Sequence, residues 1–402
     1  MFTIVKHEMF TFVDQIKLMD IKYTQALFEK HKEQTLYHRY ITNEKIKPLL
    51  SKYKNKAVVN VVGKSVLGDD IFSVKIGSGP KKILMWSQMH GNESTTTKAI
   101  FDFLNTCISD INITASILKE CTLCIIPILN PDGAKAYTRV NANTVDLNRD
   151  AQDQTQPESV VLNTVFNDFK PHFCFNLHGQ RTIFSAGNSN NSATISFLAP
   201  AQDKDCTVTP TRKVAMEVIV NMNKTLQELI PNQVGVYDDA FNINCVGDTF
   251  QSKNIPTILF EAGHFANDYA REKTRELIYM SYMSSLLYIA ENNVDGTKYQ
   301  DYFNIPENEK LFFDVIIKNV RPNTKAETIV DIAFQFEERL EHEEVIFIPI
   351  VKKIGDLTNY YAHKQIDGNG SVVLAINNDE LKIDSANVFV KLNNEKIVLF
   401  VK

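Results

Sequence analysis

The chain has 402 residues, of which 44% are hydrophobic and 23% charged, so we expect a folded globular protein and exclude a disordered one. A net charge of -5 and a pI near 6.0 leave no basic surface for phosphate groups, which excludes nucleic acid as an expected partner. No stretch approaches the roughly 20 apolar residues of a membrane span, and the N-terminus lacks a secretory signal pattern, so we expect a cytoplasmic protein without membrane contact.

The first half of the chain begins helical and then alternates between strands and helices. Residues 8–50 mix apolar and charged positions at helical spacing, which predicts helices or helical turns. Residues 57–77 are β-branched and broken by Gly-Asp-Asp, which predicts a hairpin, and the apolar run 81–89 predicts a short buried strand. A helix is expected over 94–110, followed by another inner strand over 121–130.

The alternation continues with strands at 172–179 and 256–265 and helices at 211–230 and 271–293. Short apolar runs that alternate with helices predict an α/β fold with a mixed, largely parallel central sheet and helices on both faces. The later runs are strand-like, with hardly any helix among them: 311–320, 327–336, 344–355, 370–377, 386–392 and 396–402. We therefore expect three parts: a helical N-terminal segment (1–50), a main α/β domain (51–298) and a small β-rich domain (299–402).

The six cysteines show no disulfide framework spacing, which indicates reduced, mostly buried thiols. The CxxC pair at residues 121–124 has no second pair to complete four zinc ligands, and burial explains it better.

Polar side chains stand where inner strands end. His90 and Glu93 follow the run 81–86, His178 ends a second strand, and Glu261 ends a third. The carboxyl ends of such strands open into the crevice where α/β sheets bind ligands. Two histidines and one carboxylate from separate segments form the three-ligand set of a catalytic zinc site. The spacing of three lets His90 and Glu93 share one side of a helical turn.

A non-metal explanation exists for each of these residues. A histidine after a strand is most often a hydrogen-bonded residue without metal, and His178 or Glu261 alone would indicate little. Their joint occurrence in this order favours the metal site.

The segment 130–150 lies between them along the chain. Its first four residues, Asn-Pro-Asp-Gly, predict a turn, because proline fixes φ and glycine tolerates positive φ. The segment also carries Arg139, Asn148 and Arg149 with few apolar neighbours, and an arginine beside an asparagine suits a carboxylate. Asp146 could orient a metal-bound imidazole through its second nitrogen. A solvated loop is the alternative interpretation.

Taken together, HGNE, NPDG, DLNRD, NLHG and ILFEAG resemble the successive motifs of the zinc metallocarboxypeptidases, the family of carboxypeptidase A, over residues 60–290. The resemblance implies a carboxypeptidase-like catalytic domain over 51–298 that holds one zinc ion per chain. It also implies a role for each motif residue: His90, Glu93 and His178 as zinc ligands, Glu261 as general base, Arg139 at the scissile carbonyl, Asn148 and Arg149 at the substrate carboxylate, and Asp146 behind a zinc histidine.

Some positions depart from the family pattern. Arg139 lies nine residues after Asn130, which is closer than in the animal digestive enzymes. Tyr237 is the candidate for the family's mobile tyrosine, at a slightly long spacing. His264, just after the base, is an additional polar group. No stretch of the usual inhibitory propeptide size precedes the domain, so we expect no latent precursor.

These residues predict a hydrolase. Zinc would make its bound water more acidic while Glu261 moves the proton, and the carboxylate site favours exopeptidase action on peptides or acyl amino acids with a free carboxylate. An amidase that acts on acyl amino acids or on peptidoglycan-type D-amino-acid bonds is the alternative, and a narrow, basic pocket would favour it. A binding module with an inactive site is the third possibility. The preferred terminal residue, the choice between L- and D-residues and the oligomeric state are left open.

Overall fold

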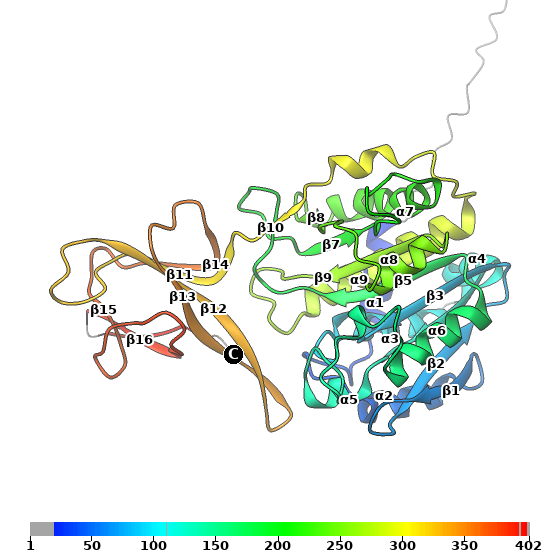
Figure 1. Ribbon diagram of the computed structural model, residues 1–402, viewed down its shortest axis with the longest axis horizontal. Helices are drawn as coiled ribbons and strands as arrows, with labels where there is room; N and C mark the ends of the chain where they lie inside the picture. Colours follow the sequence, from blue (N-terminus) through cyan, green and yellow to red (C-terminus); the bar gives the residue numbers. More distant parts are fainter. Residues whose placement is uncertain (1–19, 110, 394, 400–402) are drawn as a thin grey trace, which may run out of the picture.

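The computed structural model of the chain describes residues 20–109, 111–393 and 395–399, with only the backbone at 111–113. An α/β part is followed by a β-rich part, and Figure 1 shows the two beside each other. The predicted helical residues 8–19 and strand residues 400–402 lie outside the described ranges. Among the described helices, none combines the length and apolar character needed to cross a membrane.

An eight-stranded sheet forms the centre of the α/β part, in the order β1-β2-β4-β3-β5-β9-β7-β8. Its strands are β1 (Val58–Lys64), β2 (Asp70–Ile76), β3 (Lys81–Ser87), β4 (Cys121–Ile126), β5 (Phe173–Gly179), β7 (Ile195–Leu198), β8 (Val234–Val236) and β9 (Thr257–Ala262). The inner pairs β4/β3, β3/β5 and β5/β9 are parallel, as is β7/β8, whereas β1/β2, β2/β4 and β7/β9 are antiparallel. The predicted mixed, largely parallel sheet is confirmed.

Helices cover both faces of this sheet. They are α1 (Ile21–His31), α2 (Asn43–Tyr53), α3 (Thr95–Ser109), α4 (Ile111–Glu120), α5 (Pro131–Ala136), α6 (Pro157–Phe169), α7 (Pro210–Gln227), α8 (Val246–Ser252) and α9 (Glu272–Glu291), with single 3-10 turns η1 (Leu147–Arg149) and η2 (Gln300–Asn304). Neighbouring strand residues face opposite sides, so Met85 packs in the core with α3, α7 and α9, while Trp86 packs with α6 and α8. Inner strands buried on both faces explain the continuous apolar runs in the sequence.

The Asn-Pro-Asp-Gly segment is not the isolated turn that its sequence predicts. It begins the short helix α5, because the Asn130 side chain accepts a hydrogen bond from the backbone N–H of Gly133 at 2.8 Å and so caps the helix. Pro131 suits the first helical position, where no backbone N–H is needed. Turns and helix starts use the same residue types. The predicted change of chain direction is therefore at the right position, but it is a helix start and not an isolated turn.

The β-rich part contains two further sheets with a core of their own. Their strands are β11 (Phe312–Val320), β12 (Val330–Glu341), β13 (Glu344–Gly355) and β14 (Tyr361–Asp367) in one sheet, and β15 (Val373–Ala375), β16 (Phe389–Leu392) and β17 (Glu395–Val398) in the other. Each of the six predicted runs overlaps a strand. The sequence analysis missed β14, whose mixed polar residues are only partly buried and give no apolar run.

A two-stranded pairing joins the two parts: β10 (Asn308–Glu309) pairs with β6 (Ser185–Ala186) of the α/β part. The connection after α9 therefore returns along the α/β part before the β-rich sheets begin. As a result, the hairpin formed by β12 and β13 lies against the α/β part, as Figure 1 shows in orange.

Candidate active site

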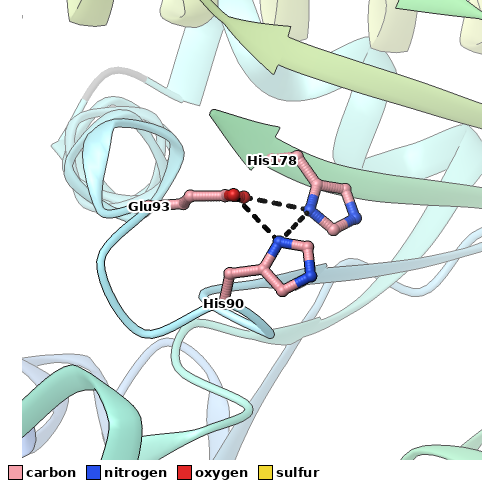
Figure 2. A group of neighbouring side chains, drawn as sticks. All are labelled: His90, Glu93 and His178. Atoms are coloured by element: carbon pink, nitrogen blue, oxygen red, sulfur yellow. Dashed lines mark hydrogen bonds and ion pairs between the residues drawn. The ribbon is translucent and has the colours of Figure 1, made fainter. Parts of the chain in front are cut away.

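Three side chains meet at the carboxyl ends of β3 and β5. His90 Nδ1 lies 2.9 Å from Glu93 Oε1, and His178 Nδ1 lies 3.0 Å from Glu93 Oε2 and 3.1 Å from His90 Nδ1. All three ligand atoms fall within 4.8 Å of one another, and Figure 2 shows them pointing toward a common centre. Both histidines are almost fully buried. The structure thus brings together the three residues that the sequence analysis selected.

A tight turn between β3 and α3 places His90 and Glu93. The backbone N–H of Glu93 donates to the carbonyl of His90 at 3.1 Å, and Gly91 stands inside that turn. A Cβ at Gly91 would lie 1.9 Å from the carbonyl carbon of Gly133 in α5, so only glycine fits against that helix. This close approach keeps the exit from the strand tight.

The charges of the three side chains suit a divalent metal. Burial opposes the ionisation of Glu93, but the neighbouring His90 and His178 outweigh it and hold the pKa of Glu93 well below its usual range. Burial lowers the pKa of His178, which favours the neutral imidazole that a metal needs. His178 Nε2 is buried and has no hydrogen-bond partner among the described residues. Two imidazole nitrogens and one carboxylate form a donor set that zinc prefers.

Asp146 lies behind His90, where the sequence analysis placed it. Its Oδ1 atom is 3.1 Å from Nε2 of His90, the ring nitrogen that faces away from Glu93. The same oxygen accepts the backbone N–H of Asn148 at 2.9 Å. Burial opposes ionisation, but His90 and Arg139 hold the pKa of Asp146 well below its usual range. A carboxylate in this position fixes the orientation of the imidazole ring.

Arg139 reaches the cluster from the loop after α5. Its Nε atom donates to Asp146 Oδ2 at 3.1 Å, and its Nη1 atom donates to Glu93 Oε1 at 3.3 Å. The side chain is about half exposed, at 48%, so the guanidinium borders both the cluster and the solvent. A cation here can stabilise negative charge that develops beside the cluster.

Asn148 and Arg149 sit on the η1 turn. The Asn148 side-chain oxygen accepts the backbone N–H of Val246 at 2.9 Å, which fixes its amide beside α8. Arg149 Nη1 donates to the Asn148 carbonyl at 2.7 Å and to Cys245 Sγ at 3.1 Å. No carboxylate within the described ranges pairs with this exposed guanidinium. An anionic group from outside the chain could therefore take that position.

Glu261 stands on β9 directly opposite His178 of β5 in the strand register. Burial raises the pKa of Glu261 well above its usual range, and the Glu93 carboxylate raises it further. Its Oε2 atom is buried without a hydrogen-bond partner in the described part of the chain. A buried carboxyl group with a raised pKa and a free oxygen is suited to accept and return a proton.

Tyr237 and His264 have different surroundings. Tyr237 follows β8 and lines the cleft around the cluster of His90, Glu93 and His178. Its ring packs against Phe184, with 5.4 Å between the ring centroids. Burial and then the Glu261 carboxylate raise the pKa of Tyr237 to about 12. His264 is buried outside the cleft lining and packs against His363 at 4.2 Å. The additional polar group seen in the sequence is thus part of the packing between the two parts of the protein.

A cleft of about 820 Å³ contains the cluster and all the other predicted site residues except Asp146. It also holds residues that the sequence analysis missed. Asn176, two residues before His178, has a buried amide without hydrogen-bond partners among the described residues. The β12–β13 hairpin adds Gln335, Phe336, Glu337, Glu338, Phe347, Ile350 and Lys352 to the lining. Asn176 could have been suspected from its alternation with His178, but no local pattern marks the hairpin residues.

Comparisons with known proteins agree with this geometry. Residues 42–240 match the family model described as zinc carboxypeptidase. Carboxypeptidase SOL1 of Arabidopsis thaliana is 27% identical over 163 residues, which are 35% of this chain and 33% of the relative. Gamma-D-glutamyl-L-diamino acid endopeptidase 1 of Lysinibacillus sphaericus is 35% identical over 81 residues, 18% of this chain and 20% of the relative. The matches thus span a third or less of these curated relatives.

Solved structures show the same fold. A metallo-carboxypeptidase from Burkholderia cenocepacia superposes with a TM-score of 0.50 at 15% identity, over 62% of this chain and 69% of that one. These structures show that the α/β part has a metallocarboxypeptidase-like fold. The stretch that matches the zinc carboxypeptidase model, residues 42–240, is just under half of the chain. That range contains every predicted site residue except Glu261.

Proposed function

We propose that the protein is a zinc-dependent carboxypeptidase that removes the terminal residue from a peptide or acyl-peptide substrate with a free carboxylate. One observation carries the proposal: the cluster of His90, Glu93 and His178 lies beside the partly buried Glu261 on adjacent strand ends. His90, Glu93 and His178 would hold one zinc ion. When bound, zinc supplies a Lewis acid that polarises a carbonyl group and makes water more acidic.

The other side chains would share the remaining work of the reaction. Glu261 takes the proton from the attacking water and returns it to the leaving amine. Arg139 stabilises the negative charge that develops on the carbonyl oxygen. Asn148 and Arg149 bind the terminal carboxylate, because the amide and the unpaired guanidinium offer several charge-assisted donors. The Tyr237 hydroxyl, with its pKa raised to about 12, stays protonated and can donate to the substrate.

The domain boundaries and the role of each domain are also a proposal. Residues 1–50 would brace the catalytic domain, 51–298 would contain it, and 299–402 would form an accessory domain. A separate hydrophobic core within the β-rich part supports this division. The pairing of Gln88 Nε2 with the Ile41 carbonyl at 3.0 Å supports a bracing role for the described residues of the first segment.

The amidase alternative has one observation in its favour, the match to the relative named Gamma-D-glutamyl-L-diamino acid endopeptidase 1. The lining of the cleft counts against a narrow, basic pocket, because acidic side chains such as Asp238, Asp248 and Glu337 alternate with its cations. The carboxypeptidase activity therefore remains the better supported function.

A substrate screen on the zinc-loaded protein separates the two. Blocked dipeptides with each type of terminal residue form one arm, and muropeptides with D-residues form the other, with the Glu261→Gln variant as a background control. Turnover of the dipeptides supports the carboxypeptidase. Turnover of the muropeptides alone moves the function to the alternative, and no turnover in either arm contradicts both.

A further inference from the structure

The β-rich part contributes one wall of the cleft that holds the metal cluster. Its residues come from the strands β12 and β13, and they lie near Tyr137 and Thr182 of the α/β part. Residues of η1 and α8 also line the cleft, and contacts with this region hold the side chains of Asn148 and Arg149.

Glu338 on β12 is the charged contact between this wall and the α/β part. Its Oε2 atom accepts a hydrogen bond from the Tyr137 hydroxyl at 2.6 Å, and its Oε1 atom lies 2.7 Å from Arg39 Nη1. Burial alone would lower the pKa of Arg39, but the carboxylate of Glu338 outweighs it and leaves that pKa raised. Burial and Glu338 together raise the pKa of Tyr137, so its hydroxyl stays a donor. One hydrogen bond and one ion pair therefore connect Tyr137 and Arg39 to the same carboxylate.

The contact with Tyr137 bears on Arg139. Tyr137 ends α5 in a left-handed conformation with φ of 56°, and the next residue, Thr138, closes the turn by donating from its backbone to Gly133 at 2.9 Å. Arg139 is the residue directly after Thr138. A non-glycine residue keeps such a conformation only where its surroundings hold it. The packing of Tyr137 against Tyr40 and its hydrogen bond to Glu338 provide that hold.

Arg39 links the same carboxylate to the metal-binding turn. The backbone carbonyl of Arg39 accepts a hydrogen bond from the Ser94 hydroxyl at 2.5 Å, and Ser94 directly follows Glu93. Glu338 therefore contacts Tyr137, two residues before Arg139, and Arg39, whose backbone contacts the residue after Glu93. Its position on a strand of the β-rich part makes that part a support of the catalytic geometry.

We propose that Glu338 is a positioning residue for the hydrolytic reaction, which holds Arg139 in place through Tyr137. The proposal rests on the proposed function, in which Arg139 stabilises charge on the carbonyl oxygen. The β-rich part is then a component of the active site, and its removal or displacement would impair the chemical step before it impaired the binding of zinc.

Tyr137→Phe is the cleanest test, because it removes the hydroxyl while leaving Arg39 paired with Glu338. Loss of a hydrogen bond to a charged acceptor predicts a fall in kcat of about tenfold, with KM changed by less than about twofold. Glu338→Gln should act in the same direction. Glu341→Gln, on the exposed end of the same strand, is the matched control and should keep wild-type kinetics.

A double-mutant cycle with Arg139→Ala separates positioning from a general loss of stability. If Tyr137 and Glu338 act through Arg139, then Tyr137→Phe should change kcat by less than about twofold in the Arg139→Ala background. An equal loss in both backgrounds would overturn the proposal, as would wild-type kcat in both single variants.

Limited digestion with trypsin gives a readout that does not need the enzyme's activity. Trypsin cuts after arginine, and release of the segment should expose the Arg139–Val140 bond, which mass spectrometry can follow as a specific fragment. In the zinc-loaded protein this cut should be several-fold faster in Tyr137→Phe and Glu338→Gln than in wild type and Glu341→Gln. Equal cutting rates would reject the positioning role. If wild type hydrolyses no substrate, the proposed function fails, while this comparison still decides whether Glu338 holds the segment.

Discussion

Glu93 and His178 meet across two segments that are 85 residues apart in the chain, with 3.0 Å between Glu93 Oε2 and His178 Nδ1. The same carboxylate oxygen accepts the backbone N–H of Gly179 at 3.0 Å. A backbone donor and an imidazole therefore fix the Glu93 side chain from the β5 side, while His90 approaches from the β3 side. The fold thus holds the Glu93 carboxylate between the two strand ends.

The first prediction is that His178→Ala loses most of its zinc, because two remaining ligands bind the ion far more weakly than three. Wild type should hold about one zinc per chain by metal analysis. His342→Asn, at an exposed position with φ of 51°, is a matched control for the loss of a histidine. Equal zinc contents in wild type and His178→Ala would show that His178 is not a ligand.

The second prediction concerns Glu261. Glu261→Gln should keep its zinc and its ability to bind substrate, but lose turnover by about 10²-fold or more, because the amide cannot take a proton from water. Steady-state kinetics and metal analysis on the same samples check both halves. Near-normal kcat would exclude Glu261 as the base. His264 is unsuited to replace it, because it lies outside the cleft lining and packs against His363.

The fold around the cluster of His90, Glu93 and His178 could be predicted from local patterns. Apolar runs mark the inner strands, and parallel strands bring their carboxyl ends to one edge, so His90 and His178 were expected to lie near each other. The contact between Asp146 and His90 was likewise expected, from the resemblance of the motifs to a known family. The catalytic and metal-binding roles of these residues stay predictions that the experiments above decide.

Other features depend on contacts that no local pattern records. Glu338 and Tyr137 are 201 residues apart, and nothing near either one in the sequence points to the other. The strand β14 lacks an apolar run because its side chains are only partly buried. The Asn-Pro-Asp-Gly segment could begin a helix or form a turn, and the capping bond of Asn130 decides between them.

The third prediction uses Asp314, which lies between the two parts of the protein. Its carboxylate accepts from Tyr269 at 2.8 Å and from the backbone of Phe336 at 2.6 Å, and burial raises its pKa to about 6. An unfolded aspartate titrates near pH ~3.9, so between about pH 4 and pH 6 the folded state holds a proton that the unfolded state has lost. The free energy of unfolding should therefore fall as the pH rises through this window, by up to about 3 kcal/mol.

Asp314→Asn should remove this part of the pH dependence, because the amide does not titrate. Urea unfolding at pH 4.5 and pH 7 gives the difference for wild type, for Asp314→Asn and for Asp384→Asn, an exposed control in the same part of the protein. The difference between the two pH values should change in Asp314→Asn alone. The same difference in all three proteins would contradict the raised pKa of Asp314.

The last prediction is that the enzyme distinguishes a free terminal carboxylate from an amide. Arg149 has no carboxylate partner in the described part of the chain, and a substrate carboxylate would form paired, charge-assisted hydrogen bonds with it and with Asn148. An amidated terminus cannot accept those bonds in the same way. A lost hydrogen bond to a charged group costs about 1.5 to 3 kcal/mol, which predicts at least a roughly tenfold lower kcat/KM for amidated peptides.

The Arg149→Ala variant tests which group makes the distinction. With the guanidinium gone, free-acid peptides should slow while amidated peptides change little, so the ratio of their kcat/KM values should approach one. Arg181→Ala is the matched control, because it removes another exposed arginine from the cleft lining while leaving η1 intact. If the wild-type enzyme hydrolyses both termini at equal rates, exopeptidase action is excluded and an amidase that cuts within its substrate becomes the better description. A ratio that stays high in Arg149→Ala but falls in Arg181→Ala would assign the carboxylate site to Arg181.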